Sequence, residues 1–220
     1  AEAALEALVP GVAAMTFMDV ATFDYAGAEL WISRSGYTGE DGYEISVPEA
    51  VAAQFASALL EQPDVEAIGL GARDSLRLEG GLCLYGHDID TETRPFEAAL
   101  GWAIQKVRRP DGDRAGGFPG ADAVFADLGG NAPRKRVGLK PEGRAPMREG
   151  VVLYAAAEGG APIGTITSGG FGPTVGGPVA MGYVSAEYAA LETQIFGELR
   201  GKRVPVTVAK LPFVAANFKR

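Results

Sequence analysis

The sequence predicts an α+β protein, with a mixed α/β N-terminal part followed by a C-terminal antiparallel β-barrel or sandwich. Strand and helix patterns alternate in the first half of the chain. The second half contains short strand-like runs between Gly-rich turns, which is typical of barrels and sandwiches. Between the halves, residues 110–120 (PDGDRAGGFPG) concentrate Gly, Pro and charge, as linkers do. We therefore predict two domains, residues 1–114 and residues 115–220.

The N-terminal part is predicted to contain a β-hairpin. Residues 28–33 (AELWIS) and 43–47 (YEISV) have the side chains of strands. The segment between them contains the turn-forming residues Gly36, Gly39 and Gly42. Residues 102–106 (WAIQK) resemble a strand that closes this part of the chain.

Two helices are predicted within the same part. The first begins at Pro48 and runs to about residue 61, since Pro is tolerated and Glu is favoured in a first helical turn. Its apolar residues recur at helical spacing, at Val51, Phe55, Leu59 and Leu60. The second helix spans residues 71–80, where leucines lie among charged side chains.

Six strands are predicted in the C-terminal part, with no long helix between them. This repetition favours antiparallel pairing in a barrel or a sandwich. The strands cover residues 136–139, 151–155, 163–167, 179–184, 194–199 and 204–209.

The composition excludes several classes of protein. The formal net charge of −8 argues against a nucleic-acid partner, because such proteins usually need a basic face. No apolar run reaches the ~18–20 residues of a membrane span, so we expect no membrane partner. Residues 1–6 (AEAALE) lack the basic region of a signal peptide. Because the chain does not begin with Met, we expect a fragment or a processed form.

Cysteine and histidine are too few for several kinds of site. One cysteine, Cys83, forms no internal disulfide, which favours a reducing compartment. One Cys and one His do not make a tetrahedral zinc site, so no metal is predicted. A Cys83–His87 dyad lacks the third group that usually orients such a pair.

Residues 35–44 (SGYTGEDGYE) form the first candidate segment. Three glycines allow the backbone to turn tightly and to approach a ligand. Tyr37 offers a stacking face and a hydroxyl. Glu44 has the geometry to accept two hydrogen bonds from an N–C–N edge of a ligand. The alternative is a hairpin turn with an incidental tyrosine.

Three further segments have alternatives of their own. Residues 69–79 (GLGARDSLRLE) are either an anion site at a helix start or a helix with a solvated charged face. Residues 81–90 (GLCLYGHDID) carry carboxylates beside His87, suited to acid–base work, or form a loop capped by Asp. Residues 167–174 (TSGGFGPT) are interpreted as a flexible turn, and without Lys-Ser or Lys-Thr they are no phosphate loop.

Taken together and in this order, the segments resemble the T-protein family of the glycine cleavage system, the aminomethyltransferases. The match extends from about residue 30 to the end, and eight blocks in register are far more specific than one motif. They are residues 35–47 (SGYTGEDGYEISV), 71–90 (GARDSLRLEGGLCLYGHDID), 117–121 (GFPGA), 136–139 (RVGL), 145–150 (APMREG), 164–173 (GTITSGGFGP), 179–184 (VAMGYV) and 210–214 (KLPFV).

This resemblance implies a reaction, a co-substrate and a partner. The lipoyl arm of H-protein presents an aminomethyl group, and its methylene passes to tetrahydrofolate with release of ammonia. The products are 5,10-methylenetetrahydrofolate and the dihydrolipoyl arm. We therefore expect tetrahydrofolate and lipoylated H-protein as binding partners. The implied compartment is the cytoplasm in a bacterium or the mitochondrial matrix in a eukaryote.

The resemblance also implies folate contacts at five positions. Glu44 would hold the amino-pyrimidine edge of the pterin, while Tyr37, Arg73 and Arg136 would contact or line the folate pocket. Phe218 follows Asn in the tail of the sequence, where the family has Tyr, so the ring is kept and the hydroxyl is lost.

No catalytic residue is predicted. In the family an Asp near the reactive N5 of folate belongs to an N-terminal region that we expect to precede this chain. Asp41, Asp74 and Asp88 are not proposed as substitutes for it.

Three alternatives stay open. The chain could belong to another folate-dependent transferase or demethylase, such as the folate domain of dimethylglycine or sarcosine dehydrogenase or a dimethylsulfoniopropionate demethylase. It could be an inactive folate-binding fragment. It could also resemble the related iron–sulfur assembly factors, but Cys83 lacks their preceding Lys-Gly. The runs GLCLYGHDID and KLPFV favour the T-protein.

Overall fold

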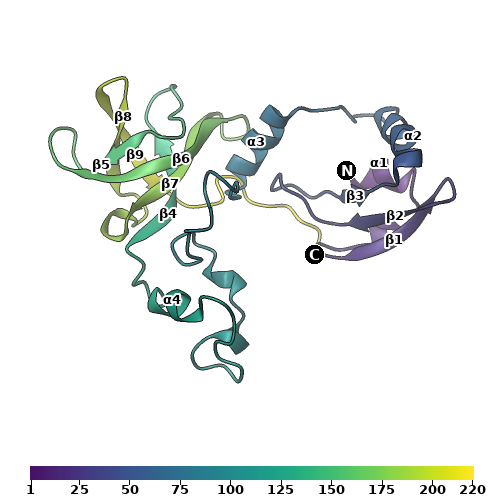
Figure 1. Ribbon diagram of the computed structural model, residues 1–220. Coiled ribbons are helices and arrows are strands. Elements are labelled where there is room, and N and C mark those ends of the chain that lie inside the picture. Colours follow the sequence, from purple (N-terminus) through teal and green to yellow (C-terminus); the bar gives the residue numbers. More distant parts are fainter. The chain divides into compact units, whose positions relative to one another are not determined.

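The computed structural model describes all residues, 1–220, and they form two compact units. Unit 1 comprises Ala1–Gly80 together with Ala215–Arg220, and unit 2 comprises Gly81–Val214. The chain therefore leaves unit 1 after Gly80 and returns to it for its last six residues (Figure 1). The domain boundary expected near residue 115 stays a prediction.

Unit 1 is built on a three-stranded antiparallel sheet of order β1-β2-β3. Its strands are β1 (Val20–Tyr25), β2 (Ala28–Ser33) and β3 (Glu44–Ser46). Along β2, Leu30 and Ile32 are buried while Glu29 and Trp31 are exposed, so one face of the sheet packs on a core. The opposite face is open, and Trp31 on it is 57% exposed.

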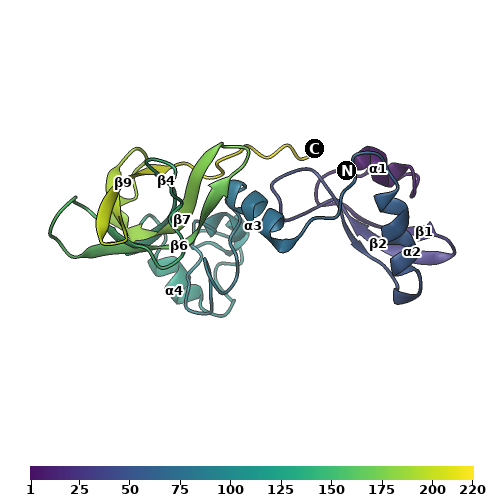
Figure 2. The same cartoon turned by 90° about the horizontal axis from the view of Figure 1, so that it is seen from above.

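Short helices supply the other half of this core. They are α1 (Glu2–Glu6), the 3-10 turn η1 (Val12–Ala14) and α2 (Glu49–Leu60). Figure 2 shows α2 lying across the strands of the sheet. Phe55 of α2 is buried, and its ring contacts the ring of Tyr25 edge-on at 4.9 Å. A further helix, α3 (Leu70–Glu79), completes the unit.

Unit 2 contains a closed antiparallel barrel of order β4-β7-β6-β5-β8-β9 (Figure 1). Pairing of β4 with β9 closes it, from Gly138 opposite Ala209 to Pro141 opposite Val206. Its interior is filled by aliphatic side chains such as Leu139, Leu153 and Ile166, each fully buried. The strands are β4 (Arg134–Pro141), β5 (Val152–Tyr154), β6 (Pro162–Gly172), β7 (Gly177–Ser185), β8 (Gln194–Leu199) and β9 (Lys202–Ala209). Of the two predicted architectures, the barrel is therefore correct.

Two predictions about local structure were wrong. Residues 102–106 are not a strand, because the 3-10 turns η2 (Gly101–Ala103) and η3 (Lys106–Arg108) occupy this stretch. The Arg109 guanidinium donates to the carbonyls of Gly101 and Ile104, which a strand would have offered to a neighbour. Sequence patterns also missed α1, β1 and the short helix α4 (Ala121–Ala126).

The second wrong prediction is the flexible turn at residues 167–174. Most of this segment belongs to β6, which pairs with β7 through Gly169 opposite Ala180 and Gly170 opposite Val179. A Cβ atom at Gly169 would lie 1.7 Å from the carbonyl oxygen of Met147. Glycine is required there by close backbone contact inside the barrel wall and not by a turn. None of the helices is both long and apolar enough to cross a membrane.

Candidate functional site

The loop between β2 and β3, residues 34–43, carries Tyr37 and leads directly into Glu44. Gly39 has φ +77°, and a Cβ atom there would lie 3.1 Å from the Cα atom of Gly80. The loop therefore packs its backbone against the C-terminal end of α3. At the other end of α3, the Arg73 guanidinium lies 4.5 Å from the centre of the Tyr37 ring. The structure thus brings two of the predicted folate residues into direct contact.

Glu44 is exposed on the open face of the sheet, opposite Ser33 of β2. The Ser35 hydroxyl donates to Glu44 Oε2 at 2.7 Å, and the Ser33 and Ser35 hydroxyls lie 2.7 Å apart. These two serines orient the carboxylate while leaving it accessible to a ligand. Sequence reasoning missed their role, although Ser35 opens the candidate segment 35–44 and Ser33 ends the strand predicted before it.

A buried ion pair anchors the tip of the same loop. Arg34 is 1% exposed and donates from Nε to Asp41 Oδ1 at 3.0 Å and from Nη2 to Asp41 Oδ2. Its Nη1 donates to Glu2 Oε2 and to the carbonyl of Met15. The Arg34 hydrogen bonds lower the pKa of Asp41, and the same bonds raise the pKa of Arg34. The sequence offered no signal for this pair beyond the charges themselves.

Phe218 also lies in unit 1. Its ring stacks on the ring of Phe17, with 4.0 Å between centroids and an interplanar angle of 4°. One face of the Phe218 ring is therefore covered by protein. The preceding residue, Asn217, contacts the tip of the β2–β3 loop, at Glu40 and Asp41.

The fifth predicted residue, Arg136, lies in unit 2 and is buried in β4. Its Nε donates to the carbonyl of Ala98 at 2.9 Å, and its Nη1 donates to the carbonyl of Gly81 at 3.1 Å. Nη1 also lies 2.9 Å from Met181 Sδ. Arg136 thereby holds the segment that precedes the barrel against the barrel wall.

Two alternatives were weighed for residues 81–90, acid–base work beside His87 and a loop capped by Asp. The contacts of Asp88 fit the capped loop. It is 1% exposed and accepts hydrogen bonds from the amide of Leu84, the Ser168 hydroxyl at 2.8 Å and the Thr167 hydroxyl. Its own carbonyl accepts the Tyr183 hydroxyl at 2.7 Å. The neighbouring His87 has a different partner, and its Nδ1 lies 2.7 Å from Glu149 Oε2.

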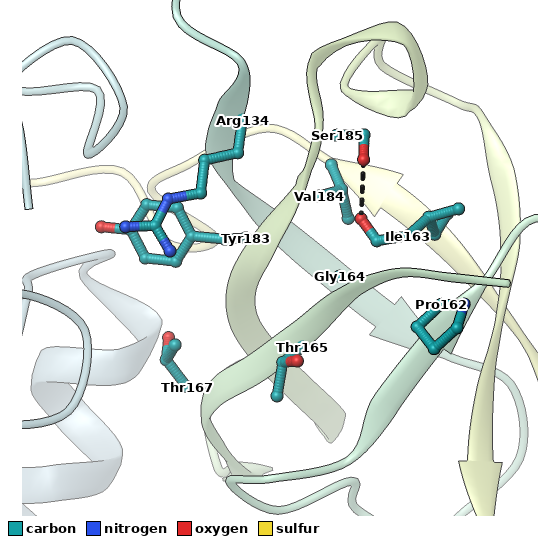
Figure 3. A pocket seen from close by; sticks show the side chains of 9 residues that line it. All are labelled: Arg134, Pro162, Ile163, Gly164, Thr165, Thr167, Tyr183, Val184 and Ser185. Atoms are coloured by element: carbon teal, nitrogen blue, oxygen red, sulfur yellow. Dashed lines mark hydrogen bonds between the residues drawn. The ribbon is translucent and has the colours of Figure 1, made fainter.

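A cavity of about 330 Å³ lies beside the barrel strands of unit 2. Figure 3 shows Arg134 of β4 over the ring of Tyr183, with Thr165 and Thr167 of β6 on the facing wall. The Arg134 guanidinium lies 4.6 Å from the Tyr183 ring centre and forms an ion pair with Glu97 at 3.2 Å. Burial raises the pKa of Tyr183 to about 12. Glu97 does not belong to the cavity lining, and it also forms an ion pair with Arg94 at 2.9 Å.

The burial of α3 corrects a further expectation. Its charged residues were weighed as a solvated face, but Arg77 and Glu79 are buried, with 3% and 2% exposure. Arg77 Nε donates to Asp74 Oδ1 at 2.8 Å. Arg73 is exposed, so the first turn of α3 faces solvent while the last turn is part of the interior.

Comparison with known proteins extends over nearly the whole chain. Residues 1–108 match the family model described as the GCVT N-terminal domain, and residues 134–215 match that of the glycine cleavage T-protein C-terminal barrel domain. The chain belongs to the glycine cleavage T-protein family. This confirms the resemblance and the predicted fold class, a mixed α/β part followed by an antiparallel barrel.

Individual members of the T-protein family are similar over the same span. The mitochondrial aminomethyltransferases of dog and human are 47% and 46% identical over 205 residues, which cover 93% of this chain and 49% of each relative. The crystal structure of aminomethyltransferase T from Bartonella henselae aligns with a TM-score of 0.88 and 46% identity, covering 99% of this chain and 58% of that one. The chain spans about half the length of the curated relatives it matches.

Proposed function

We propose that this chain supplies a tetrahydrofolate-binding part of an aminomethyltransferase of the glycine cleavage system. The enzyme would move the methylene of a lipoyl-bound aminomethyl group from H-protein to tetrahydrofolate, with release of ammonia. Membership of the T-protein family and the names of the relatives support this reaction. One structural observation carries it: the β2–β3 loop carries Tyr37 and leads directly into Glu44 at the start of β3, and the Arg73 guanidinium lies over the Tyr37 ring.

The residues present fit a folate. Glu44 is an exposed carboxylate whose orientation is set by Ser35, and a carboxylate accepts two parallel N–H bonds from an amino-pyrimidine edge. The Tyr37 ring offers a flat apolar surface suited to an aromatic ligand. Arg73 adds a positive charge beside it, which suits the carboxylates of a glutamyl tail. An aromatic ring, a cation and an oriented carboxylate together match a flat heteroaromatic anion.

Tetrahydrofolate, when bound, supplies the nitrogen atoms that accept the methylene carbon. The work of this chain is to bind and orient the co-substrate, since holding two reactants in the productive geometry accounts for a large part of such a rate enhancement. The roles of Phe218 and Arg136 as folate contacts stay predictions.

We assign no proton transfer to the acidic residues of this chain. Asp41 is engaged by Arg34, Asp74 by Arg77 and Asp88 by the hydroxyls of β6. A general acid or base must be within hydrogen-bond reach of the reacting group, and these carboxylates are already committed to protein partners.

We propose lipoylated H-protein as the macromolecular partner and, following the mitochondrial relatives, the matrix or a bacterial cytoplasm as the compartment. In the intact enzyme, the reverse reaction tests this directly. H-protein with its lipoyl arm in the reduced dihydrolipoyl form, ammonia and 5,10-methylenetetrahydrofolate should together support turnover to tetrahydrofolate and the aminomethylated arm. Absence of H-protein-dependent turnover would contradict the proposal.

The Glu44 role is tested by calorimetry with tetrahydrofolate. Glu44→Ala should weaken binding about 10- to 100-fold, because hydrogen bonds to a charged group contribute about 1.5–3 kcal/mol. Ser35→Ala should have a smaller effect, since it removes only the group that orients Glu44. Glu49→Ala is the matched control, an exposed glutamate in the first turn of α2. Equal affinities for Glu44→Ala and Glu49→Ala would refute the role of Glu44.

A further inference from the structure

The last six residues of the chain, Ala215–Arg220, return to unit 1 and contact the β2–β3 loop. We infer that this tail is a positioning element for the loop that carries Tyr37 and leads into Glu44, with Asn217 and Lys219 as its positioning residues. The consequence for folate rests on the proposed function, whereas the contacts between tail and loop do not depend on it.

Asn217 binds both acidic residues at the tip of the loop. Its Oδ1 accepts the backbone N–H of Asp41 at 2.7 Å, and its Nδ2 donates to Glu40 Oε2. A side-chain amide combines a donor and an acceptor on one planar group, so Asn217 can make both bonds at once. The two bonds fix the backbone and a side chain at the tip, midway between Tyr37 and Glu44.

Lys219 joins the same tip to the N-terminal segment of unit 1. Its backbone N–H donates to Asp41 Oδ1 at 3.3 Å, and its carbonyl accepts the backbone N–H of Phe17 at 2.7 Å. Its ammonium donates to Glu2 Oε2 and to the carbonyl of Ala13, both at 2.7 Å. The stacked rings of Phe17 and Phe218 lie between these polar contacts along the chain. The tail is therefore attached both to the β2–β3 loop and to the N-terminal segment of unit 1.

The loop keeps its other anchors when the tail is weakened. Arg34 still binds Asp41 through two nitrogens, and Gly39 still packs on Gly80. Loss of the tail contacts should therefore loosen the tip without unfolding unit 1. Because Glu40, Asp41 and Asn217 are not deeply buried, the groups that lose partners regain them from water. A change in loop order, separate from a change in stability, is the expected signature.

Asn217→Asp is the decisive substitution. It keeps the acceptor for the Asp41 N–H and replaces the donor facing Glu40 with a second carboxylate. At pH 7, hydrogen exchange of the amides in residues 36–44 should accelerate and tetrahydrofolate affinity should fall about tenfold, the effect of one charge-assisted hydrogen bond. The melting temperature of unit 1 should stay close to that of the parent protein.

Adding Glu40→Gln to Asn217→Asp supplies a test that a merely structural role would not pass. The new amide at position 40 can donate to the new carboxylate at position 217, so slow exchange and folate affinity should both return. Arg220→Ala, in the same exposed tail, is the control and should change neither measurement.

The outcomes separate the two proposals. Faster loop exchange in Asn217→Asp, restored by Glu40→Gln, supports the tail as a positioning element even if the parent protein binds no folate. In that case the proposed function fails alone. Tetrahydrofolate binding in the parent, together with loop exchange and affinity that Asn217→Asp leaves unchanged, overturns the tail proposal alone. Failure of the double substitution to restore either quantity also overturns it.

Discussion

Two pairs of charged side chains that were singled out in the sequence, one pair in each unit, have opposite environments. In unit 2, Arg136 and Asp88 are buried, with 7% and 1% exposure, and their hydrogen bonds go to carbonyls, hydroxyls and an amide of the protein. In unit 1, Glu44 and Arg73 are exposed and keep groups directed to solvent. Unit 1 also has buried charges, namely Arg77 and Glu79 in the last turn of α3 and Arg34, which binds Asp41 within the loop that carries Tyr37.

This difference follows from the architectures. A closed barrel has no free edges, so the polar groups at its surface can be used to attach the preceding segment, residues 81–98. An open three-stranded sheet leaves one face and its loops uncovered, and a loop needs anchors from elsewhere to hold a ligand-binding geometry. A charge in a family motif is therefore available to a ligand only where the protein leaves it accessible.

The largest effect is expected from removing a buried charge of unit 2. Asp88→Ala should destabilise unit 2 by about 3 kcal/mol, because the Leu84 amide and the Ser168 and Thr167 hydroxyls lose a buried acceptor. Hydrogen exchange of the barrel strands measures this loss separately from unit 1. Folate affinity at low temperature, where both units stay folded, should be unchanged.

His87→Ala is the control for that experiment. His87 is adjacent in sequence, but its side chain is 46% exposed and bonded to Glu149, which is 55% exposed. Exposed pairs contribute about 0–1 kcal/mol, so the barrel should be nearly unaffected. If both substitutions destabilised unit 2 equally, burial would not explain the role of Asp88.

A smaller effect is expected on the stability of the two units at low pH. In unit 1, backbone amides lower the pKa of Glu6 and Asp19, Arg34 lowers that of Asp41, and Lys219 and Arg34 lower that of Glu2. Each carboxyl therefore stabilises the fold above its ordinary value of 3.8 or 4.5, and this stabilisation is lost as the pH falls through the lower folded value. In unit 2, the same shift is found for Asp90 and Glu97.

Unit 1 should consequently lose more stability than unit 2 as the pH falls below 4.5 and 3.8 towards the lower folded pKa values. Exchange protection in each unit, corrected for the intrinsic rate at each pH, measures the difference. Asp41→Asn should reduce the pH dependence of unit 1 and leave that of unit 2 as it was. A barrel that opened first in acid would contradict the comparison.

The sequence predicted the regular elements best where side-chain pattern alone determines them. Strand-forming residues predicted β2, helical spacing predicted α2, and repeated short strands predicted a barrel or a sandwich, of which the barrel is found. Residues 102–106 resemble a strand in their side chains, but Arg109 binds the carbonyl of Ile104 among them and that of Gly101 just before them. The glycines of β6 have the composition of a turn. Their role in the strand follows from the close approach of the Met147 carbonyl to Gly169, which the sequence does not show.

The candidate site could be predicted only in part, because it too depends on contacts between residues that lie far apart in the sequence. Tyr37, Glu44 and Arg73 were identified from family motifs, and their roles at folate stay predictions. The groups that position them come from distant parts of the chain, since Arg34 and Glu2 are 32 positions apart and Asp41 and Asn217 are 176 positions apart. No local periodicity encodes such pairs, because tertiary packing creates them.

The smallest expected effect concerns the one departure from the family motif at a predicted folate contact, Phe218. Phe218→Tyr restores the family's hydroxyl without altering the ring, so the stack on Phe17 at 4.0 Å should be retained. Unit 1 stability should change little, since the ring is only partly buried. Tetrahydrofolate affinity should rise about twofold, corresponding to about 0.5 kcal/mol for one hydrogen bond at a partly solvated position.

Phe17→Tyr is the matched control, because it adds the same hydroxyl to the other ring of the stack. A gain in affinity confined to Phe218→Tyr would show that position 218 points its ring edge to the ligand while its face is held by the protein. Phe218 would then count, with Glu44 and Arg73, among the residues of unit 1 that stay accessible to a ligand. Equal affinities for both variants would assign Phe218 to the anchoring of the tail, together with Asn217 and Lys219.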